Sequence, residues 1–149
     1  MNPSASRTIH AARLDELDAP TLYALLRLRV DVFVVEQACP YPDLDGRDTE
    51  PDAQHWWVEE GGEPVCYLRL LTEPDGASRI GRVVTRADAR GAGLAADLLR
   101  RALASARCRR PVHLGAQAHL ADWYARFGFR VVGPPYDEDG IPHVPMTLG

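Results

Sequence analysis

The segment RVVTRADARGAGLAADLLRRAL (residues 82–103) decides the fold. A β-branched run leads through two closely spaced glycines, Gly91 and Gly93, into an apolar pattern of helical period. We therefore expect a strand, a glycine loop and a helix over about 91–106. Because the first N–H groups of a helix have no partners and lie at the positive end of its dipole, this loop is predicted to bind a phosphate or pyrophosphate beside the cation of Arg90.

Two other phosphate-binding interpretations of this loop need residues that the sequence lacks. A P-loop requires a second glycine at a wider spacing followed by Lys, and neither is present. A dinucleotide fold requires Gly-x-Gly-x-x-Gly, but Ala96 stands at the third glycine position. A helix start with permissive glycines and no ligand stays open, because short glycine motifs are weak evidence.

The remaining elements follow from apolar periods and turn residues. A helix over about 20–36 is capped by Asp18, with Pro20 in its first turn. Its predicted apolar face comprises Leu22, Leu25, Leu26, Val30, Phe33 and Val34. Strands are expected at 7–13, 54–60, 64–72, 78–85, 111–117, 129–133 and 141–148, with a short helix at 118–127. This order predicts an α/β or α+β sheet covered by helices, with a β-α-β crossover at the glycine loop.

The proline- and aspartate-rich segment CPYPDLDGRDTEPD (39–52) is predicted to be a loop. Its start resembles a calcium-binding EF-hand loop. The spacing fails, however, because Arg47 and Gln54 occupy the fifth and twelfth positions, where that loop needs oxygen ligands and a bidentate Glu. We therefore interpret it as a polar loop.

The length and charge of the chain exclude several classes of function. Its 149 residues suit a single domain spanning 1–149. The 17 basic and 21 acidic residues leave a net charge of −4, which does not favour nucleic acid. No apolar run approaches a membrane span, and the first residues, MNPSASRTIHAAR, lack a signal-peptide pattern, so a cytoplasmic location is expected. Three scattered cysteines and five histidines without ligand spacing predict neither disulfides nor a metal site.

Two motifs resemble the GNAT superfamily of acetyl-coenzyme A-dependent N-acetyltransferases. RGAGLA (90–95) fits its Gln/Arg-x-x-Gly-x-Gly/Ala signature, and YARFGF (124–129) resembles its Tyr-x-x-x-Gly-Phe element. Longer blocks are similar to the ElaA-type branch of this superfamily. They are LRLRVDVFVVEQACPYPDLDGRD (26–48), IGRVV (80–84), GAQAHLADWYARFGF (115–129) and YDEDGIPHVPM (136–146).

The resemblance implies a GNAT fold, with a mixed, mostly antiparallel sheet of six to seven strands flanked by helices. It also implies transfer of acetyl from acetyl-CoA to a primary amine of a small molecule or protein, by direct attack in a ternary complex and without a metal. Two alternatives are a non-catalytic acyl-CoA sensor or interaction domain, and a different nucleotide-phosphate binder. Relatives of this kind often form dimers, so a homodimer is one expected assembly.

The resemblance also implies roles for individual residues. The backbone amides that would hold the coenzyme pyrophosphate belong to Arg90, Gly91, Ala92, Gly93, Leu94 and Ala95. The strand holding Val83 and Val84 would splay from its neighbour at 111–117, so that its main chain pairs with the pantetheine and the thioester carbonyl. Tyr124 would protonate the departing thiolate, unless it only anchors the coenzyme or packs in the core. Gln117 replaces the Asn that many relatives use to contact the coenzyme.

The general base and the acceptor pocket are less specified by the sequence. Glu36, at the end of the first long helix, is the favoured base, and Glu59 and His113 are alternatives. A covalent acyl carrier at Cys66 or Cys108 is conceivable, although neither has a His at a recognisable spacing. The candidates for the acceptor side are Arg29, Arg69, Arg82, Asp137, Asp139 and His143.

Overall fold

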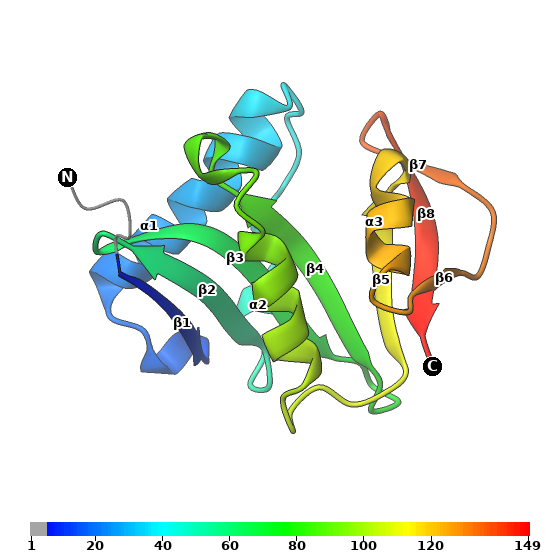
Figure 1. Ribbon diagram of the computed structural model, residues 1–149, viewed down its shortest axis with the longest axis horizontal. Helices are drawn as coiled ribbons and strands as arrows, with labels where there is room; N and C mark the ends of the chain where they lie inside the picture. The colour runs from blue at the N-terminus through cyan, green and yellow to red at the C-terminus, as the bar shows by residue number, and fades with distance from the viewer. Residues whose placement is uncertain (1–5) are drawn as a thin grey trace.

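A computed structural model describes residues 6–149 and contains one sheet of eight strands (Figure 1). Residues 1–5, on which the signal-peptide expectation partly rested, lie outside the described residues. The strands are β1 (Arg7–Ala12), β2 (Gln54–Glu60), β3 (Glu63–Thr72), β4 (Ser78–Thr85), β5 (Val112–Gln117), β6 (Arg130–Val131), β7 (Tyr136–Glu138) and β8 (Ile141–Leu148). The predicted strands at 54–60, 78–85 and 141–148 are confirmed at both ends.

The sheet is mixed and mostly antiparallel, as expected. Its strand order is β1-β2-β3-β4-β5-β8-β6, with β7 also paired to β8, and the only parallel pair among the described strands is β4 with β5. The expected count of six to seven strands was one too low, because β7 is only three residues long. So short a segment, exposed along its length, carries no alternating pattern that would reveal a strand in the sequence.

Within residues 6–149, three α-helices cover the sheet: α1 (Ala19–Val30), α2 (Leu94–Leu103) and α3 (Ala121–Ala125). The predicted cap of α1 is confirmed, since the Asp18 carboxylate accepts a hydrogen bond from the Thr21 N–H at 2.8 Å. The helix predicted over 118–127 is too long, because its first turn is the 3₁₀ segment η5 (Ala118–Leu120). No helix in the described part of the chain is long and apolar enough to cross a membrane.

The long helix predicted over 20–36 is wrong in its second half. After Val30 the chain continues as a π-helical segment, η2 (Asp31–Glu36). The wider turn rotates the following side chains relative to the 3.6-residue period, so Val35 is 67% exposed while Val32 is buried. On α1 itself the buried residues are Leu25, as predicted, and Leu28 and Arg29, which the predicted stripe did not include.

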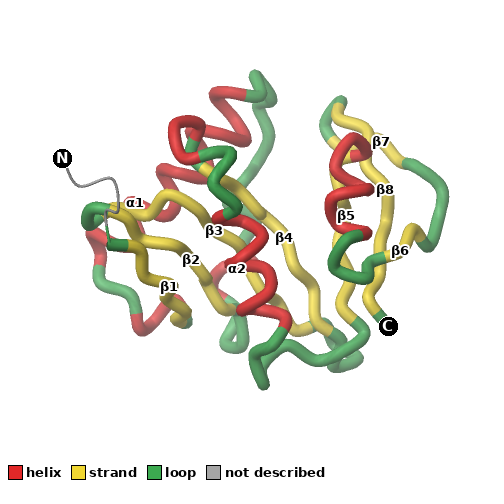
Figure 2. The backbone as a smooth tube through the Cα atoms, viewed as in Figure 1, coloured by secondary structure: helices red, strands yellow, loops and turns green. Residues whose placement is uncertain are grey.

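Two hydrophobic cores lie on opposite faces of the sheet. The larger core packs under α2 and α3, and its fully buried centre includes Leu68, Leu98 and Leu99. The smaller core lies between α1 and the sheet, around Leu25 and Tyr67. The tube view shows α2 over the strands before the glycine loop and α3 over those after it (Figure 2). We call these two faces the α2 face and the α1 face.

The sheet opens between β4 and β5. These strands pair only at Ser78 with Val112 and Arg79 with His113, after which they diverge (Figure 1). The predicted splaying of β4 from the 111–117 strand is therefore confirmed. The remainder of β4 presents backbone groups toward the opening instead of toward β5.

Candidate functional site

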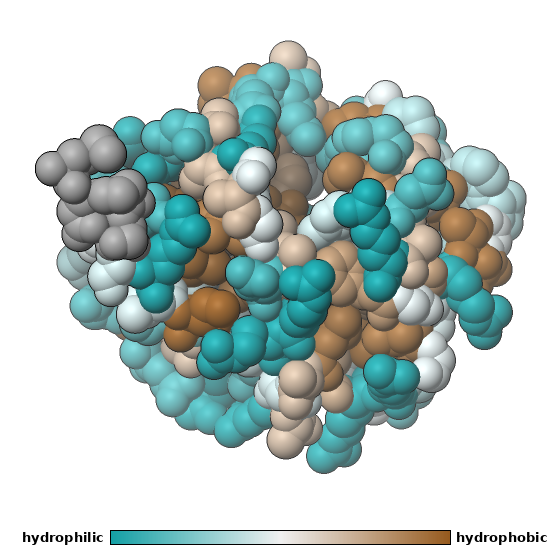
Figure 3. Space-filling view, viewed as in Figure 1, coloured by the Kyte–Doolittle hydropathy of each residue, from teal (hydrophilic) through white to brown (hydrophobic). Residues whose placement is uncertain are grey.

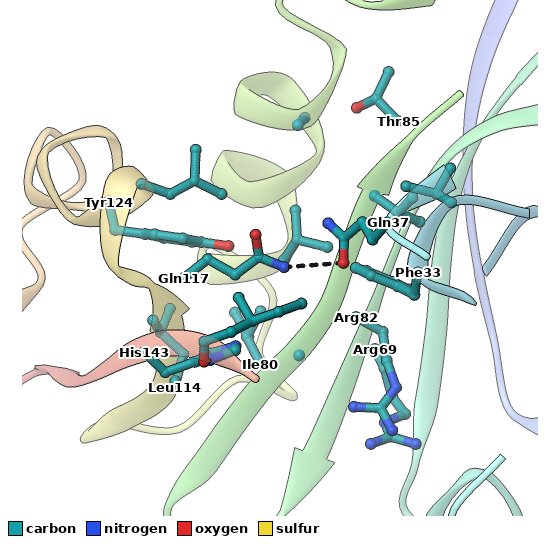
Figure 4. A pocket seen from close by; sticks show the side chains of 18 of the residues that line it. Phe33, Gln37, Arg69, Ile80, Arg82, Thr85, Leu114, Gln117, Tyr124 and His143 are labelled. Carbon is teal, nitrogen blue, oxygen red and sulfur yellow. Dashed lines mark hydrogen bonds between the residues drawn. The ribbon is translucent and has the colours of Figure 1, made fainter. Parts of the chain in front are cut away.

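A cavity of about 840 Å³ occupies the opening between β4 and β5. One wall comes from β4, the glycine loop and η2, and the other from β5, α3 and the β7–β8 hairpin. The space-filling view shows a hollow where the sheet divides, with hydrophilic side chains around much of its rim (Figure 3). The close-up shows side chains from both halves of the sheet converging on this space (Figure 4).

The glycine loop has the geometry that the predicted anion site requires. Gly91 and Gly93 have φ of +86° and +75°, a left-handed conformation that glycine adopts without a side-chain clash. Gly93 caps α2, and no side chain caps the first amides of this ten-residue helix. A Cβ on either glycine would meet no atom within 4 Å, so the loop is open on the side that a ligand would approach. The loop therefore fits a pyrophosphate held by the first amides of α2.

Arg90 is held against the opening by two partners. Its Nε donates to the Thr85 carbonyl at 3.0 Å, and its two terminal nitrogens donate to the Glu36 carboxylate at 2.7 and 2.9 Å. This pairing lowers the pKa of Glu36, mainly through the hydrogen bond from Arg90. A carboxylate with a lowered pKa and a bound guanidinium is a poor proton acceptor. This pairing disfavours Glu36 as the general base, although Glu36 lines the cavity and its role stays a prediction.

The wall formed by β4 carries a bulge. Tyr67 pairs with Val84 and Arg69 with Gly81, so two residues of β4 face one of β3. Arg82, inside this bulge, has a positive φ of 56°, which is uncommon for a residue with a side chain. The bulge re-aims the backbone beside Val83, which lines the cavity, so an extended ligand could pair with this edge as an added strand.

Tyr124 points into the cavity from α3. Its ring is 6% exposed and packs edge-on against Trp123 and Phe129, which fixes its direction. Its hydroxyl has no hydrogen-bond partner among residues 6–149, and its end of the ring faces the space beside Gln117 (Figure 4). Burial raises the pKa of Tyr124, so the hydroxyl stays protonated and can donate. Gln117 donates to Gln37 across the opening at 3.4 Å.

Three arginines and three aspartates form a network on the α1 face, and four of the six side chains belong to buried residues. Arg29, fully buried, donates to Asp43 at 3.0 Å and to Asp48 at 2.6 Å. Arg69 binds Asp45 with two hydrogen bonds of 2.8 and 2.9 Å. Arg82 completes the network by donating to the Asp43 carbonyl at 3.0 Å and to the Asp45 carboxylate at 3.3 Å.

This network corrects the expectation for Arg29 and explains why the loop at 39–52 is rich in aspartate. Arg29 does not line the cavity, so its predicted contact with the acceptor is replaced by a structural role. Arg69, Arg82 and Asp45 do line it. Three aspartates of the loop at 39–52 are therefore partners of these arginines. Sequence spacing alone could not reveal this pairing, because the arginines come from α1, β3 and β4.

The other predicted site residues divide clearly. Those lining the cavity are Glu36, Arg69, Arg82, Val83, Val84, Arg90, Gly91, Gly93, Leu94, Ala95, Gln117, Tyr124, Asp139 and His143. Those outside it are Arg29, Glu59, Ala92, His113 and Asp137. The alternative bases Glu59 and His113 are thus away from the opening.

The cysteines do not support a covalent carrier. Cys66 is buried in the larger core, and burial raises the pKa of its thiol to about 11, so the reactive thiolate is scarce near neutral pH. Neither Cys66 nor Cys108 lines the cavity. Cys39 does line it, and its thiol donates to the Asp139 carbonyl at 3.3 Å.

The chain is similar to known proteins along nearly its whole length. The family model of the acetyltransferase (GNAT) domain matches residues 27–149. Protein ElaA of Escherichia coli K12 is 44% identical over 137 residues, which cover 89% of this chain and 90% of that protein. The UPF0039 protein Rv2851c of Mycobacterium tuberculosis is 52% identical over 135 residues, covering 88% of this chain and 86% of that protein.

Solved structures agree with the sequence comparison. The crystal structure of an acyl-CoA N-acyltransferase from Pseudomonas aeruginosa has a TM-score of 0.90 at 44% identity, covering 97% of this chain and all of that one. The structure of E. coli ElaA also has a TM-score of 0.90, at 40% identity and the same coverage. With its splayed sheet and open glycine loop, the chain belongs to the GNAT family of acyl-CoA-dependent N-acyltransferases, in the ElaA-type branch.

Proposed function

We propose that this protein transfers the acetyl group of acetyl-CoA to a primary amine, by direct attack while both substrates are bound. One observation carries the proposal. The cavity joins the glycine loop to the acceptor side of the sheet, and the unpartnered hydroxyl of Tyr124 points into it. A donor and an acceptor that enter such a cavity from its two ends could meet there without a covalent enzyme intermediate.

Each part of the cavity then has a task. The first amides of α2 and the glycine loop would bind the pyrophosphate, and the free edge of β4 at Val83 and Val84 would pair with the pantetheine arm. Tyr124, which its raised pKa keeps protonated, would donate its proton to the departing coenzyme thiolate. Gln117 would help to orient the coenzyme near that hydroxyl.

The alternative function is a non-catalytic acyl-CoA sensor or interaction domain. A sensor needs the pyrophosphate loop but has no need of a buried acid beside the thioester. The packing that holds Tyr124 in place therefore favours catalysis. The homodimer, the cytoplasmic location and the extent of the domain over 1–149 stay predictions.

Thiol release from acetyl-CoA with a panel of primary amines tests this function, together with calorimetric binding of the coenzyme. The parent is expected to bind acetyl-CoA and to release thiol only when an amine is present. Tyr124→Phe should lower the rate by about 10²-fold or more, as expected for loss of a general acid, with coenzyme binding largely retained. Tyr23→Phe, on an exposed ring outside the cavity, is the matched control and should behave as the parent.

Binding without transfer to any amine would favour the sensor. Absence of coenzyme binding would refute the proposal.

A further inference from the structure

Amine acylation needs a general base on the side of the cavity where the amine substrate would bind. The attacking nitrogen becomes cationic as it bonds to the thioester carbon, and it must then lose a proton. Two cavity carboxylates are already committed to arginines, Glu36 to Arg90 and Asp45 to Arg69. In both cases the pKa of the carboxyl group is lowered; for Asp45, opposing burial is outweighed by the arginine contacts and a backbone hydrogen bond. The group that takes the proton from the amine must therefore be another residue of the cavity wall.

His143 lies in β8 directly opposite Gln117 of β5. Along β8 the alternate residues Val144 and Met146 pack in the larger core under α3. Because side chains alternate along a strand, His143 points to the opposite face, which is the α1 face and holds the arginine–aspartate network. His143 is 7% exposed and lines the cavity (Figure 4).

The hydrogen bond of the ring determines which nitrogen can accept a proton. The Nδ1 of His143 lies 2.8 Å from the carbonyl oxygen of Ile141. A carbonyl oxygen only accepts, so Nδ1 must carry the hydrogen. In the neutral ring the other nitrogen, Nε2, then holds a lone pair. The backbone thus sets the tautomer that a general base requires.

The surroundings of the ring suit a transient positive charge. The Glu138 carboxylate lies 3.5 Å from Nε2. The ring of Tyr136 stacks on the imidazole at 5.7 Å between centroids, and this tyrosine contacts Gly115 so closely that a Cβ there would lie 2.2 Å from its hydroxyl oxygen. The other charged groups of the cavity wall near this hairpin are Asp139 and Arg79.

We propose that His143 is the general base of the transfer, with Nε2 taking the proton from the attacking amine and Glu138 stabilising the resulting imidazolium. This assignment rests on the proposed function. The nitrogen–carbon bond forms, one N–H proton passes to Nε2, the carbon–sulfur bond breaks, and the thiolate receives the proton of Tyr124. Proton exchange with water restores both side chains, so amine and thioester give amide and thiol.

The test compares His143→Asn with the matched variant His113→Asn. Asparagine can keep a donor near the position of Nδ1, and thus the bond to Ile141, while it removes Nε2. His113 lies on the neighbouring strand β5, uses Nδ1 to contact Thr147 at 2.9 Å and is outside the cavity. The acceptor probe is methoxyamine, which is neutral throughout the scan, so its own titration does not enter the pH profile.

For the parent, we expect kcat/KM to fall at low pH, where a histidine gains its proton, over a scan from about pH 5.5 to 9. His143→Asn should lose this limb and about 10²-fold or more of the rate at the plateau, with acetyl-CoA affinity within about twofold of the parent. Added imidazole should partly restore its rate. His113→Asn should match the parent. A His143→Asn variant with the rate and pH profile of the parent would overturn the assignment while leaving acetyl transfer intact.

A second measurement does not depend on turnover. In the ¹⁵N spectrum of histidine-labelled parent protein at alkaline pH, the His143 ring should be protonated on Nδ1 and bare on Nε2. The opposite tautomer would overturn the assignment. A parent that shows the expected tautomer and binds acetyl-CoA but acylates no amine would instead contradict the proposed function.

Discussion

Replacing Arg29 by Met should destabilise the protein without acting on the acceptor site. Arg29 is fully buried and makes five hydrogen bonds: two to Asp43 at 3.0 and 2.9 Å, two to Asp48 at 2.6 and 3.3 Å, and one to the Tyr67 hydroxyl at 3.5 Å. Its loss leaves two carboxylates with side chains only 2% and 10% exposed. Removing one partner of a buried ion pair costs about 3–5 kcal/mol.

The lower end of that range applies here, because each carboxylate keeps a second arginine. Asp48 retains Arg69 at 3.1 Å, and Asp43 retains Arg82 at 2.8 Å. We expect a loss of about 3 kcal/mol in the free energy of unfolding, or about 150-fold in the folding equilibrium. At about 2–4 °C per kcal/mol for a chain of this size, the Tm should fall by about 6–12 °C.

Urea and thermal unfolding followed by circular dichroism measure both quantities. Arg27→Met is the matched control, since this residue is two positions away on the same helix, is 73% exposed and lies 3.6 Å from Asp31. An exposed pair of this kind should change stability by less than about 0.5 kcal/mol. If the two variants unfold alike, the reasoning from burial fails. If Arg29→Met keeps its stability but raises the KM for the amine, Arg29 acts on the acceptor after all.

Two further predictions concern the other wall and the pH dependence of stability. Gly115→Ala should displace Tyr136, because the hydroxyl oxygen of this tyrosine would overlap the new Cβ. The variant should transfer acetyl more slowly, with an unchanged coenzyme affinity in calorimetry. Gly81→Ala, whose Cβ would meet no atom within 4 Å, is the control, and equal rates for the two variants would contradict this prediction. Burial lowers the pKa of His55. The His55 ring then binds a proton more readily in the unfolded chain than in the folded protein. The free energy of unfolding should therefore stay constant above the ordinary His pKa of about 6.5 and decrease below it, by at most about 1.4 kcal/mol per pH unit. His55→Gln should reduce the slope of the free energy of unfolding against pH, as measured by urea titrations. An unchanged slope would mean that other groups cause the pH dependence.

The elements with a strong local period could be predicted from the sequence. Strands β2, β4 and β8 appear at their predicted bounds, and the glycine loop opens onto the start of α2 as its residues require. Alternation, turn residues and left-handed glycines act over a few neighbouring positions, so a linear pattern is enough to reveal them. The segments that failed, η2 and β7, are those whose local signal was ambiguous or too short.

The features of the site also fall into those that could be predicted from the sequence and those that could not. The family, the open glycine loop and the residue that enters the cavity from α3 could be predicted from the sequence, because each is carried by a contiguous motif. The tertiary structure was needed to show that Arg29 is buried with aspartates from a distant loop, that Glu36 is bound by Arg90, and that Nδ1 of His143 binds the Ile141 carbonyl in the cavity wall. The chemistry of an arginine, carboxylate or histidine depends on its partners, and here those partners are brought by elements far apart in the chain.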